Sequence, residues 1–213
     1  MAEVHVRNTE QFTEEVRRAE KHIARRDPLL RAIIKKTGPC SIRPHHRHFE
    51  ILARSIISQQ LSTRVADVIG DRLKALNTPA RFPTALTITV TDSKLLRAAG
   101  LSNQKVSYIK DLAERTATGA IKLGTLKKLT DEQIIEQLVS IKGIGVWTAQ
   151  MFLIFSLGRL NVLPYGDLGV RKAIAQLYGL EQLPGATEIE NIARSNNWYP
   201  YCSVASWYLW RSL

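Results

Sequence analysis

Two glycines one residue apart, Gly143 and Gly145, separate two segments in which apolar residues recur at helical spacing. Glycine lets the backbone turn sharply and approach a partner closely, because it has no Cβ. The second segment is expected to be helical from Val146 to about Leu157, so the glycine amides would point outward at its N-terminus. Unpaired N–H groups and the helix dipole favour an anion there. The pair could grip a phosphate, although an ordinary helix-turn-helix corner is the better explanation of an isolated G-x-G motif.

A single carboxylate, Asp167, follows this turn, shortly after Pro164 and at the start of a helical pattern over residues 168–178. Its default role is that of an N-cap, because the side-chain oxygen can accept a hydrogen bond from an N–H group of the first helical turn. A carboxylate in a fixed position can also stabilise positive charge that develops on a reacting molecule. The same side chain can serve both purposes.

The chain as a whole is strongly basic. Its 213 residues include 30 Lys and Arg against 19 Asp and Glu, which gives a net charge of +11 and a pI near 9.9. An excess of this size is expected of nucleic-acid binding, although charge alone does not establish a site. With 45% hydrophobic and 23% charged residues, the composition is that of an ordinary globular protein. We therefore expect a folded protein whose partner is a polyanion.

Several other functional classes are disfavoured. Residues 1–7 are polar where a signal peptide would need its apolar core, and no apolar run reaches the roughly 18 residues of a membrane span. We expect a soluble intracellular protein with no membrane partner. Two cysteines, Cys40 and Cys202, imply no disulfide framework and cannot hold a four-thiolate iron–sulfur cluster. The histidines at 45, 46 and 48 match no standard zinc spacing, so zinc is not expected.

Helical periodicity extends over almost the whole chain, and the predicted fold class is all-α. The one β-leaning stretch, Leu86–Val90, has no obvious strand partner and is expected to be an extended linker or a short helix start. Proline, capping residues and glycines mark several helix ends. We expect helices at about 10–24, 28–36, 47–59, 62–76, 91–98, 103–118, 130–140, 146–157, 168–178, 187–195 and 200–211.

Loop-forming residues suggest how these helices are organised. Helix-breaking residues occur around Thr37-Gly38-Pro39 and over 158–166. They suggest that the terminal helices pack together around a middle lobe. We expect one compact unit over 1–213 with two lobes. The middle lobe spans about 42–157 and contains the hairpin at 138–148, and the terminal lobe combines about 10–41 with 158–213.

At this level of detail the sequence resembles the helix-hairpin-helix DNA glycosylases, specifically their 3-methyladenine (alkylbase) branch. The resemblance runs from about Asp27 to the C-terminus. An ordered set of motifs is far more specific than any one of them alone. The segments that carry it are Ser55–Ser62 (SIISQQLS), Gly100–Lys105 (GLSNQK), Ile141–Ala149 (IKGIGVWTA), Pro164–Arg171 (PYGDLGVR) and Trp198–Tyr201 (WYPY).

The resemblance implies excision of a damaged purine from double-stranded DNA after the nucleotide has been flipped out of the helix. Alkylation of a purine ring nitrogen makes the base a cationic leaving group, so bond cleavage passes through a sugar with oxocarbenium character. Such a sugar needs a nearby anion rather than a strong base. Asp167 matches the catalytic aspartate of the family and is our candidate for that anion.

The resemblance also implies a base pocket formed by Trp147, Met151 and Tyr201. An electron-rich indole stacks well on a positively charged methylated purine. A buried core tryptophan remains the alternative for Trp147, because large aromatic residues are commonly buried. Related glycosylases that also cut the strand carry a lysine at the position of Trp147, where it forms a Schiff base. The tryptophan therefore predicts a monofunctional enzyme without lyase activity.

Two further groups of residues are expected to contact DNA. Gln60 and Leu61, with Ser62 beside them, match the loop that the family inserts into the minor groove to fill the space of the flipped nucleotide. Without the resemblance this loop would be read as a simple helix junction. The second group belongs to the hairpin and comprises Lys142, Gly143, Gly145 and Thr148.

Hairpins of this family bind a monovalent cation through backbone carbonyls. By position, these would be the carbonyls of Val139, Ile141 and Gly143 here. Sodium or potassium at that point would fix the turn and offset phosphate charge. No other cofactor is expected to be required.

Two departures from the family pattern keep a second function open. Cys202 stands where related chains usually have arginine, which removes a cation near the pocket. Ser62 is small where some relatives place histidine. We therefore retain an alternative, a glycosylase homologue that binds and shields abasic sites without excising bases, and a more remote one, a general DNA-binding module. Whether it is a glycosylase or a homologue that shields abasic sites, the protein is expected to act as a monomer on alkylated or abasic duplex DNA. If the source is eukaryotic, we expect it in the nucleus.

Overall fold

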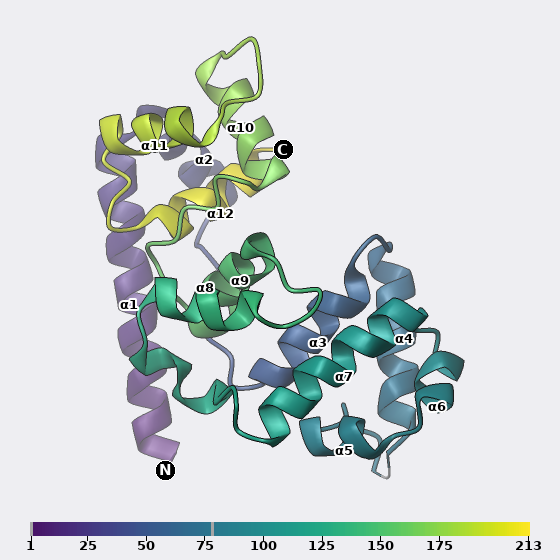
Figure 1. Cartoon of the computed structure of the whole chain (residues 1–213). Coiled ribbons are helices and arrows are strands. Elements are labelled where there is room, and N and C mark those ends of the chain that lie inside the picture. The colour runs from purple at the N-terminus through teal and green to yellow at the C-terminus, as the bar shows by residue number, and fades with distance from the viewer. Residues whose placement is uncertain (1, 78) are drawn as a thin grey trace. The chain divides into compact units, whose positions relative to one another are not determined.

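All regular structure in the described part of the chain, residues 2–77 and 79–213 of a computed structural model, is helical (Figure 1). The all-α prediction is therefore confirmed. The chain divides into two units. The first runs up to Pro44 and resumes from Leu153 to Leu213, and the second is His45–Phe152. The sequence placed these divisions at about 42 and about 157.

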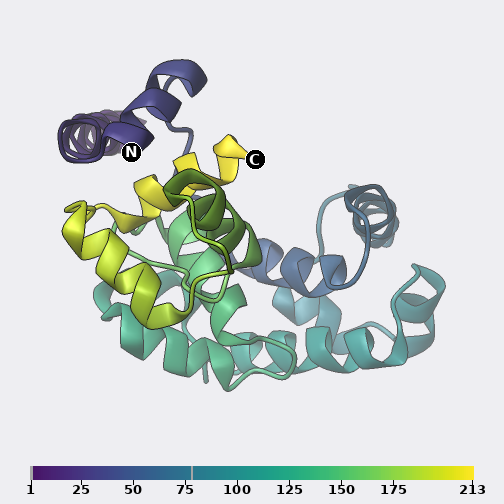
Figure 2. The same cartoon turned by 90° about the horizontal axis from the view of Figure 1, so that it is seen from above.

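The first unit is built around the C-terminal helix. Residues Cys202 to Leu209 of this helix are all buried, and the helix packs against the two helices that begin the unit and against the helix over 168–178 (Figures 1 and 2). Figure 2 looks along the long N-terminal helix. The elements are α1 (Ala2–Arg26), α2 (Pro28–Thr37), the π-helical turn η2 (Leu153–Leu157), α10 (Leu168–Tyr178), α11 (Ala186–Ser195) and α12 (Cys202–Ser212).

A buried carboxylate ties distant parts of this unit together. Asp27 is fully buried, and its Oδ1 caps α2 by accepting 3.0 Å hydrogen bonds from the N–H groups of Leu29 and Leu30. Its Oδ2 accepts the indole N–H of Trp198 at 2.8 Å and the hydroxyl of Tyr178. A buried carboxylate is tolerated only when its oxygens are paired in this way. Burial and the hydrogen bond to Asp27 raise the pKa of Tyr178 well above its ordinary value, so the phenol stays a donor.

The second unit is arranged around its longest helix, which contacts mainly helices that precede it in the chain (Figure 1). The elements are α3 (His48–Ser58), α4 (Thr63–Ala75), α5 (Ala85–Val90), α6 (Ser93–Ala98), α7 (Asn103–Ala117), the 3-10 helix η1 (Leu123–Lys128), α8 (Asp131–Val139) and α9 (Val146–Phe152). Both α3 and α5 pack on α7, and both α3 and α8 contact α9. Val106, Ile109 and Leu112 form the buried stripe of α7.

Local sequence signals account for most helix ends. Ser102 caps α7 by accepting from the Lys105 N–H, and Thr130 begins α8 with a complete capping box that includes Gln133. Gly179 ends α10 at φ +67, a left-handed backbone conformation that glycine adopts without strain. Such caps are encoded within a few residues, which explains why these boundaries could be predicted.

The β-leaning stretch was left open by the sequence, and one predicted helix changes type along its length. Leu86–Val90, expected to be an extended linker or a short helix start, lies within the short helix α5, which Thr84 caps and whose Ile88 is buried. The β-propensity of this stretch is overridden because a helix lets Ile88 pack while the main chain bonds to itself. The helix expected over 146–157 is α-helical only to Phe152 and continues as the π turn, which closes with a hydrogen bond from the Arg159 N–H to the Leu153 carbonyl. That turn lies where one unit passes into the other in sequence.

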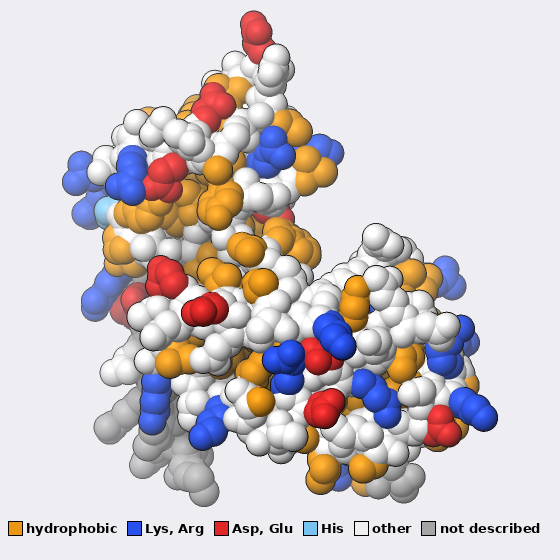
Figure 3. Space-filling view, in the orientation of Figure 1, with side chains coloured by type: hydrophobic (Ala, Val, Ile, Leu, Met, Phe, Trp, Pro, Cys, Tyr) orange, Lys and Arg blue, Asp and Glu red, His pale blue; other side chains and the backbone are white. Residues whose placement is uncertain are grey.

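Surface charge matches the basic composition. On the face drawn in Figure 3, Lys and Arg side chains are spread over the surface of both units and mixed with fewer carboxylates. None of the helices among the described residues combines the length and apolarity that a membrane crossing needs.

Candidate functional site

The hairpin turn is held in place by its own buried apolar residues and by contacts with α7. Ile141 and Ile144 are buried, and the Ile144 N–H closes the turn on the Ile141 carbonyl at 3.1 Å. Gly143 adopts φ +80, and a Cβ at this position would lie 2.1 Å from the ring of Tyr108. Both the positive φ and the aromatic ring beneath it therefore require glycine at this position. The role of Gly143 is at least partly to let the turn rest on α7.

Gly145 is different, because it is exposed and no described atom lies within 4 Å of where its Cβ would be. The first hydrogen bond of the following helix runs from the Ala149 N–H to the Gly145 carbonyl at 3.0 Å. The N–H groups before Ala149 therefore have no acceptor within α9. Lys142 is exposed beside them. This arrangement fits the predicted phosphate-binding turn. Thr148 as a whole residue, main chain included, is only 6% exposed, which leaves little of it open to a contact with DNA.

Trp147 stands on the first turn of α9 and is 49% exposed. This exposure argues against the alternative of a core tryptophan. Met151, one turn further along α9, is partly exposed. Because α9 (VWTAQMF) contains no lysine, this helix offers no amine at the position where a strand-cutting relative would carry one.

The predicted wedge residues lie in a tight turn between α3 and α4. The Leu61 N–H donates to the Ser58 carbonyl at 3.1 Å. Gln60 and Leu61 are both exposed, and Ser62 is the exposed N-cap of α4. Exposed side chains on a turn are what insertion into a groove requires. We name Ser58–Ser62 the wedge turn.

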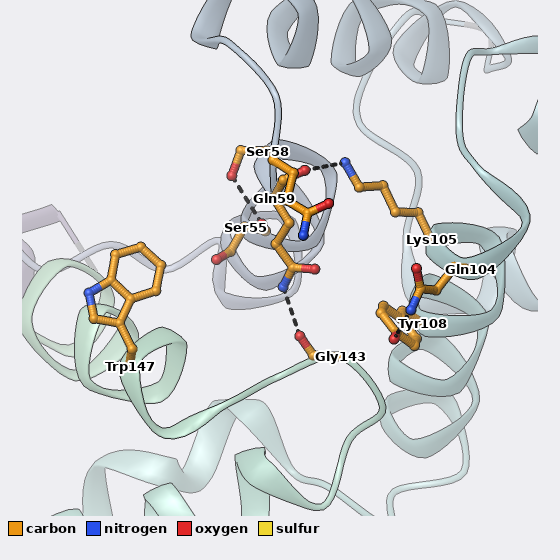
Figure 4. Close-up of a pocket in the computed structure, with 9 residues that line it drawn as sticks. Ser55, Ser58, Gln59, Gln104, Lys105, Tyr108, Gly143 and Trp147 are labelled. Carbon is orange, nitrogen blue, oxygen red and sulfur yellow. Dashed lines mark hydrogen bonds between the residues drawn. The ribbon is translucent and has the colours of Figure 1, made fainter. Parts of the chain in front are cut away.

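A cavity of about 520 Å³ lies between the wedge turn, the hairpin and α7 (Figure 4). Of its lining residues, only Gln60, Gly143 and Trp147 are among those that the sequence predicts for the site. The segment Gly100–Lys105 contributed to the resemblance but received no role, because its side-chain partners are far away in sequence. The lining residues are Ser55, Ser58, Gln59, Gln60, Gln104, Lys105, Tyr108, Gly143 and Trp147.

Asp167 lies in the first unit and is 8% exposed. Its Oδ1 accepts hydrogen bonds from the Val170 N–H at 2.8 Å and from the Trp210 indole at 2.7 Å. The N-cap role is therefore present, and the indole fixes the carboxylate further. Gly169 permits this contact, because a Cβ there would lie 2.9 Å from Cδ1 of Trp210 and 3.1 Å from Oδ1 of Asp167.

The C-terminal tryptophans differ in burial and in their partners. Trp198 is fully buried and its indole donates a hydrogen bond to Asp27, which makes it a core residue. Trp210 lies three residues after the buried Trp207 on the same helix, but it is partly exposed and its indole donates to Asp167. Helical spacing placed both on one face and could not show this hydrogen bond. Tyr201 is partly exposed and packs edge-on against His22, with ring centroids 5.4 Å apart.

Cys202 is fully buried at the start of α12. Burial raises the pKa of its thiol to about 12, so the side chain is a neutral core group. At this position the chain carries a packing residue rather than a surface cation.

The proposed cation ligands are neutral carbonyl oxygens, the donor type that suits an alkali cation. Two of the three already accept hydrogen bonds: Ile141 from the Ile144 N–H, and Gly143 from the Gln59 side-chain amide at 2.7 Å. Each carbonyl has two lone pairs, so both retain acceptor capacity and the donor set fits. Among the described residues no group of three or more His, Cys, Asp and Glu side chains could hold a metal ion.

Comparison with known proteins gives a consistent assignment. Residues 53–197 match the model of the HhH-GPD superfamily of base excision DNA repair proteins. DNA-3-methyladenine glycosylase 1 of Schizosaccharomyces pombe is 33% identical, over 97% of this chain and 92% of that protein. The alkylbase DNA glycosidase-like protein mag2 of the same yeast is also 33% identical, over 92% of each chain.

Solved structures agree. A 3-methyladenine DNA glycosylase of S. pombe in complex with abasic DNA superimposes with a TM-score of 0.80 at 33% identity, over 92% of this chain and 96% of that one. A DNA-3-methyladenine glycosidase of Bacillus halodurans gives 0.81 at 34% identity, over 91% and 88%. The sequence resemblance is thereby confirmed. The chain belongs to the HhH-GPD superfamily of base excision DNA repair proteins, within its 3-methyladenine DNA glycosylase family.

Proposed function

We propose that the protein is a monofunctional DNA glycosylase that releases alkylated purines, 3-methyladenine and 7-methylguanine, from double-stranded DNA. The observation that carries the proposal is the geometry of Asp167, a largely buried carboxylate whose Oδ1 is held by a helix N–H and an indole N–H. A carboxylate fixed in advance costs no reorganisation when positive charge develops in front of it.

The chemistry needs little else from the protein. The electron pair of the glycosidic bond leaves with the cationic purine, which becomes neutral, and the positive charge moves to the sugar. The Asp167 carboxylate stabilises that charge until water adds to the anomeric carbon and loses a proton. Because the leaving group is already cationic, no strong general acid has to protonate it.

Trp147 supplies selectivity for the charged base in this proposal. A half-exposed indole can stack on a methylated purine, and the attraction between a cation and an aromatic face is worth about 1–2 kcal/mol. With Met151, on the same helix, it would line the pocket that receives the flipped base, and the resemblance adds Tyr201 as a further base-contacting residue. A tryptophan cannot form a Schiff base with the sugar, so the product is an abasic site in an intact strand.

DNA contacts are assigned to the hairpin and the wedge turn. Lys142, Gly143, Gly145 and the first-turn amides of α9, including that of Thr148, would bind the phosphate backbone without regard to sequence. Gln60, Leu61 and Ser62 would enter the minor groove, where the first two fill the gap left by the flipped nucleotide. The net charge of +11 supports a polyanionic partner.

The test is to incubate the protein with a methylated duplex and to identify the released bases by chromatography, while abasic-site binding is measured in parallel. Release of methylated purines supports the glycosylase. Tight abasic binding without release supports a non-catalytic homologue that shields abasic sites. That second function is favoured by one observation, the 33% identity to a relative that is named only glycosidase-like.

We also propose that sodium or potassium binds the carbonyls of Val139, Ile141 and Gly143. When bound, the cation would add positive charge next to the proposed phosphate-binding turn at Gly143 and Gly145. DNA affinity should then be higher in sodium or potassium chloride than in choline chloride at equal ionic strength. Equal affinity in the three salts would rule the cation out.

The working form is proposed to be a monomer on duplex DNA, in the nucleus if the source is eukaryotic. Sedimentation of the protein with a short abasic duplex tests the first point. A one-to-one complex is expected, and a two-to-one complex would contradict it.

A further inference from the structure

The wedge turn carries backbone strain at the residue proposed to fill the DNA stack. Gln59 has φ −52 and ψ 126, and Gln60 has φ +55. With the Leu61 N–H bonded to the Ser58 carbonyl, these angles describe a type II β-turn, whose third position usually requires glycine or asparagine. Glutamine there is costly and persists only when surrounding contacts determine the conformation.

Lys105, on the first turn of α7, provides two of those contacts. Its Nζ donates to the Gln59 carbonyl at 2.7 Å (Figure 4). It also donates to the Ile57 carbonyl at 2.6 Å. These carbonyls lie at the C-terminal end of α3, where a cation interacts favourably with the helix dipole. Burial lowers the pKa of Lys105 from its ordinary value. From the sequence alone, this lysine would be interpreted as a contact for a DNA phosphate. In the structure its ammonium group is directed at the protein backbone.

The side chain of Gln59 ties the same turn to the hairpin. Its Nε2 donates to the Gly143 carbonyl at 2.7 Å (Figure 4). One face of α7 supports both elements: Lys105 holds the wedge turn, the Tyr108 ring lies under Gly143, and the Asp111 carboxylate accepts the Lys142 N–H at 2.9 Å. The hairpin turn that carries Gly143 and Gly145 and the wedge turn are therefore fixed to one another through α7 and Gln59, within a single unit.

We infer that Lys105 and Gln59 are positioning residues for damage recognition, which hold Gln60 and Leu61 in a turn ready for insertion and do not themselves contact DNA. The inference rests on the proposed function only in that the protein must prefer abasic or damaged DNA to intact duplex. The inference does not require base release, so it can be tested even if the protein has no glycosylase activity.

Lys110 offers a matched control on the same helix. Its Nζ donates to the carbonyls of Thr89 and Thr91, at 3.3 and 2.6 Å, and so caps the end of α5 as Lys105 caps the end of α3. Lys105→Met and Lys110→Met each remove one positive charge and two hydrogen bonds to carbonyls. Their effects on thermal stability should therefore be comparable, whereas only Lys105 touches the wedge turn.

The experiment is equilibrium binding of both variants to an abasic duplex and to an intact duplex over a series of salt concentrations. Lys105→Met should lose about tenfold of its preference for abasic DNA, because hydrogen bonds to a charged group are removed from the inserting turn. Its affinity for intact duplex and the slope against salt should match those of Lys110→Met. A smaller salt slope for Lys105→Met than for Lys110→Met would show a phosphate contact and overturn the inference.

A second comparison separates positioning from general loss of stability. In a protein that already carries Gln60→Ala and Leu61→Ala, adding Lys105→Met should have no further effect on abasic preference, because the residues it positions are gone. Gln59→Leu should behave in the same way. An additional tenfold loss in that background would contradict the inference, as would an unchanged preference for Lys105→Met alone. Fluorescence of 2-aminopurine beside the abasic site should report reduced unstacking with Lys105→Met and normal unstacking with Lys110→Met.

Discussion

Asp27 and Asp167 make the same pair of contacts in the same unit. Each caps the first turn of a helix, α2 or α10, through Oδ1, and each accepts the indole N–H of a C-terminal tryptophan. They differ in surroundings: Asp27 also binds the Tyr178 hydroxyl and is fully buried, whereas Asp167 keeps 8% of its surface exposed. Asp27 therefore serves the fold, whereas Asp167 combines the same two contacts with a small exposed surface.

Gly169 should be required for the support of Asp167. A methyl group there would displace the Trp210 indole, so Gly169→Ala is expected to cost about 1–3 kcal/mol of stability and to lower the rate of base release. Gly185→Ala is the control, because a Cβ at Gly185 would meet no described atom within 4 Å. Urea unfolding and single-turnover rates measure the two effects. Equal rates for the two variants would show that the indole contact is dispensable.

Strand cleavage should be absent. Because Trp147 occupies the position of the amine in strand-cutting relatives, borohydride should trap no covalent adduct between the protein and abasic DNA. The assay is gel electrophoresis of the reduced mixture. An efficiently trapped species would reveal an amine that reaches the sugar, with the exposed Lys142 as the first residue to replace.

The hairpin should contribute to affinity and not to discrimination. Gly145→Val adds a side chain in open space, so the fold should tolerate it, but the branched group would block the approach of a phosphate. Affinity for intact and abasic duplexes should fall by the same factor, about tenfold for a lost charge-assisted contact. A loss confined to abasic DNA would assign the hairpin to damage recognition.

Protonation of His48 should destabilise the fold. Burial, with the charge of Lys127 and the neighbouring histidines, lowers the pKa of this 8% exposed ring below its ordinary value. The unfolded chain then binds the proton more readily, so stability is full above the ordinary pKa and falls as pH drops below it. The urea midpoint should decline between about pH 7.5 and about pH 5.5, and less so in His48→Gln. His45→Gln removes only the weakest of these causes and should keep most of the wild-type decline, whereas a decline unchanged in His48→Gln would exclude His48 as its source.

The sequence could predict what depends on near neighbours in the chain. Apolar periodicity located the amphipathic helices, and capping residues such as Thr130 set their ends. The motif order predicted the family, which the comparisons confirm, and the proposed roles of Asp167, Trp147 and the wedge turn rest on that resemblance. Spacing also predicted the N-cap role of Asp167, which its bond to the Val170 N–H confirms.

What remained hidden depends on contacts between distant residues. Lys105 reads as a surface cation, and only the fold shows that its ammonium group binds carbonyls 46 and 48 positions away. Trp210 and Trp207 share a helix face, yet only Trp210 reaches Asp167, 43 positions away. The helical state of Leu86–Val90 was likewise left open, because its choice depends on packing against α7.

The most direct measurement is single-turnover release of methylated purines from duplex DNA by the wild type, Asp167→Asn and Asp27→Asn, each with its unfolding midpoint and abasic-site affinity recorded. Both variants remove a carboxylate that caps a helix and binds an indole, so both should lose stability. Asp167→Asn alone should lose base release, by at least about a hundredfold, while it still binds abasic DNA. Wild-type release by Asp167→Asn, or no release by the wild type itself, would contradict the assignment of Asp167 as the catalytic carboxylate of a DNA glycosylase.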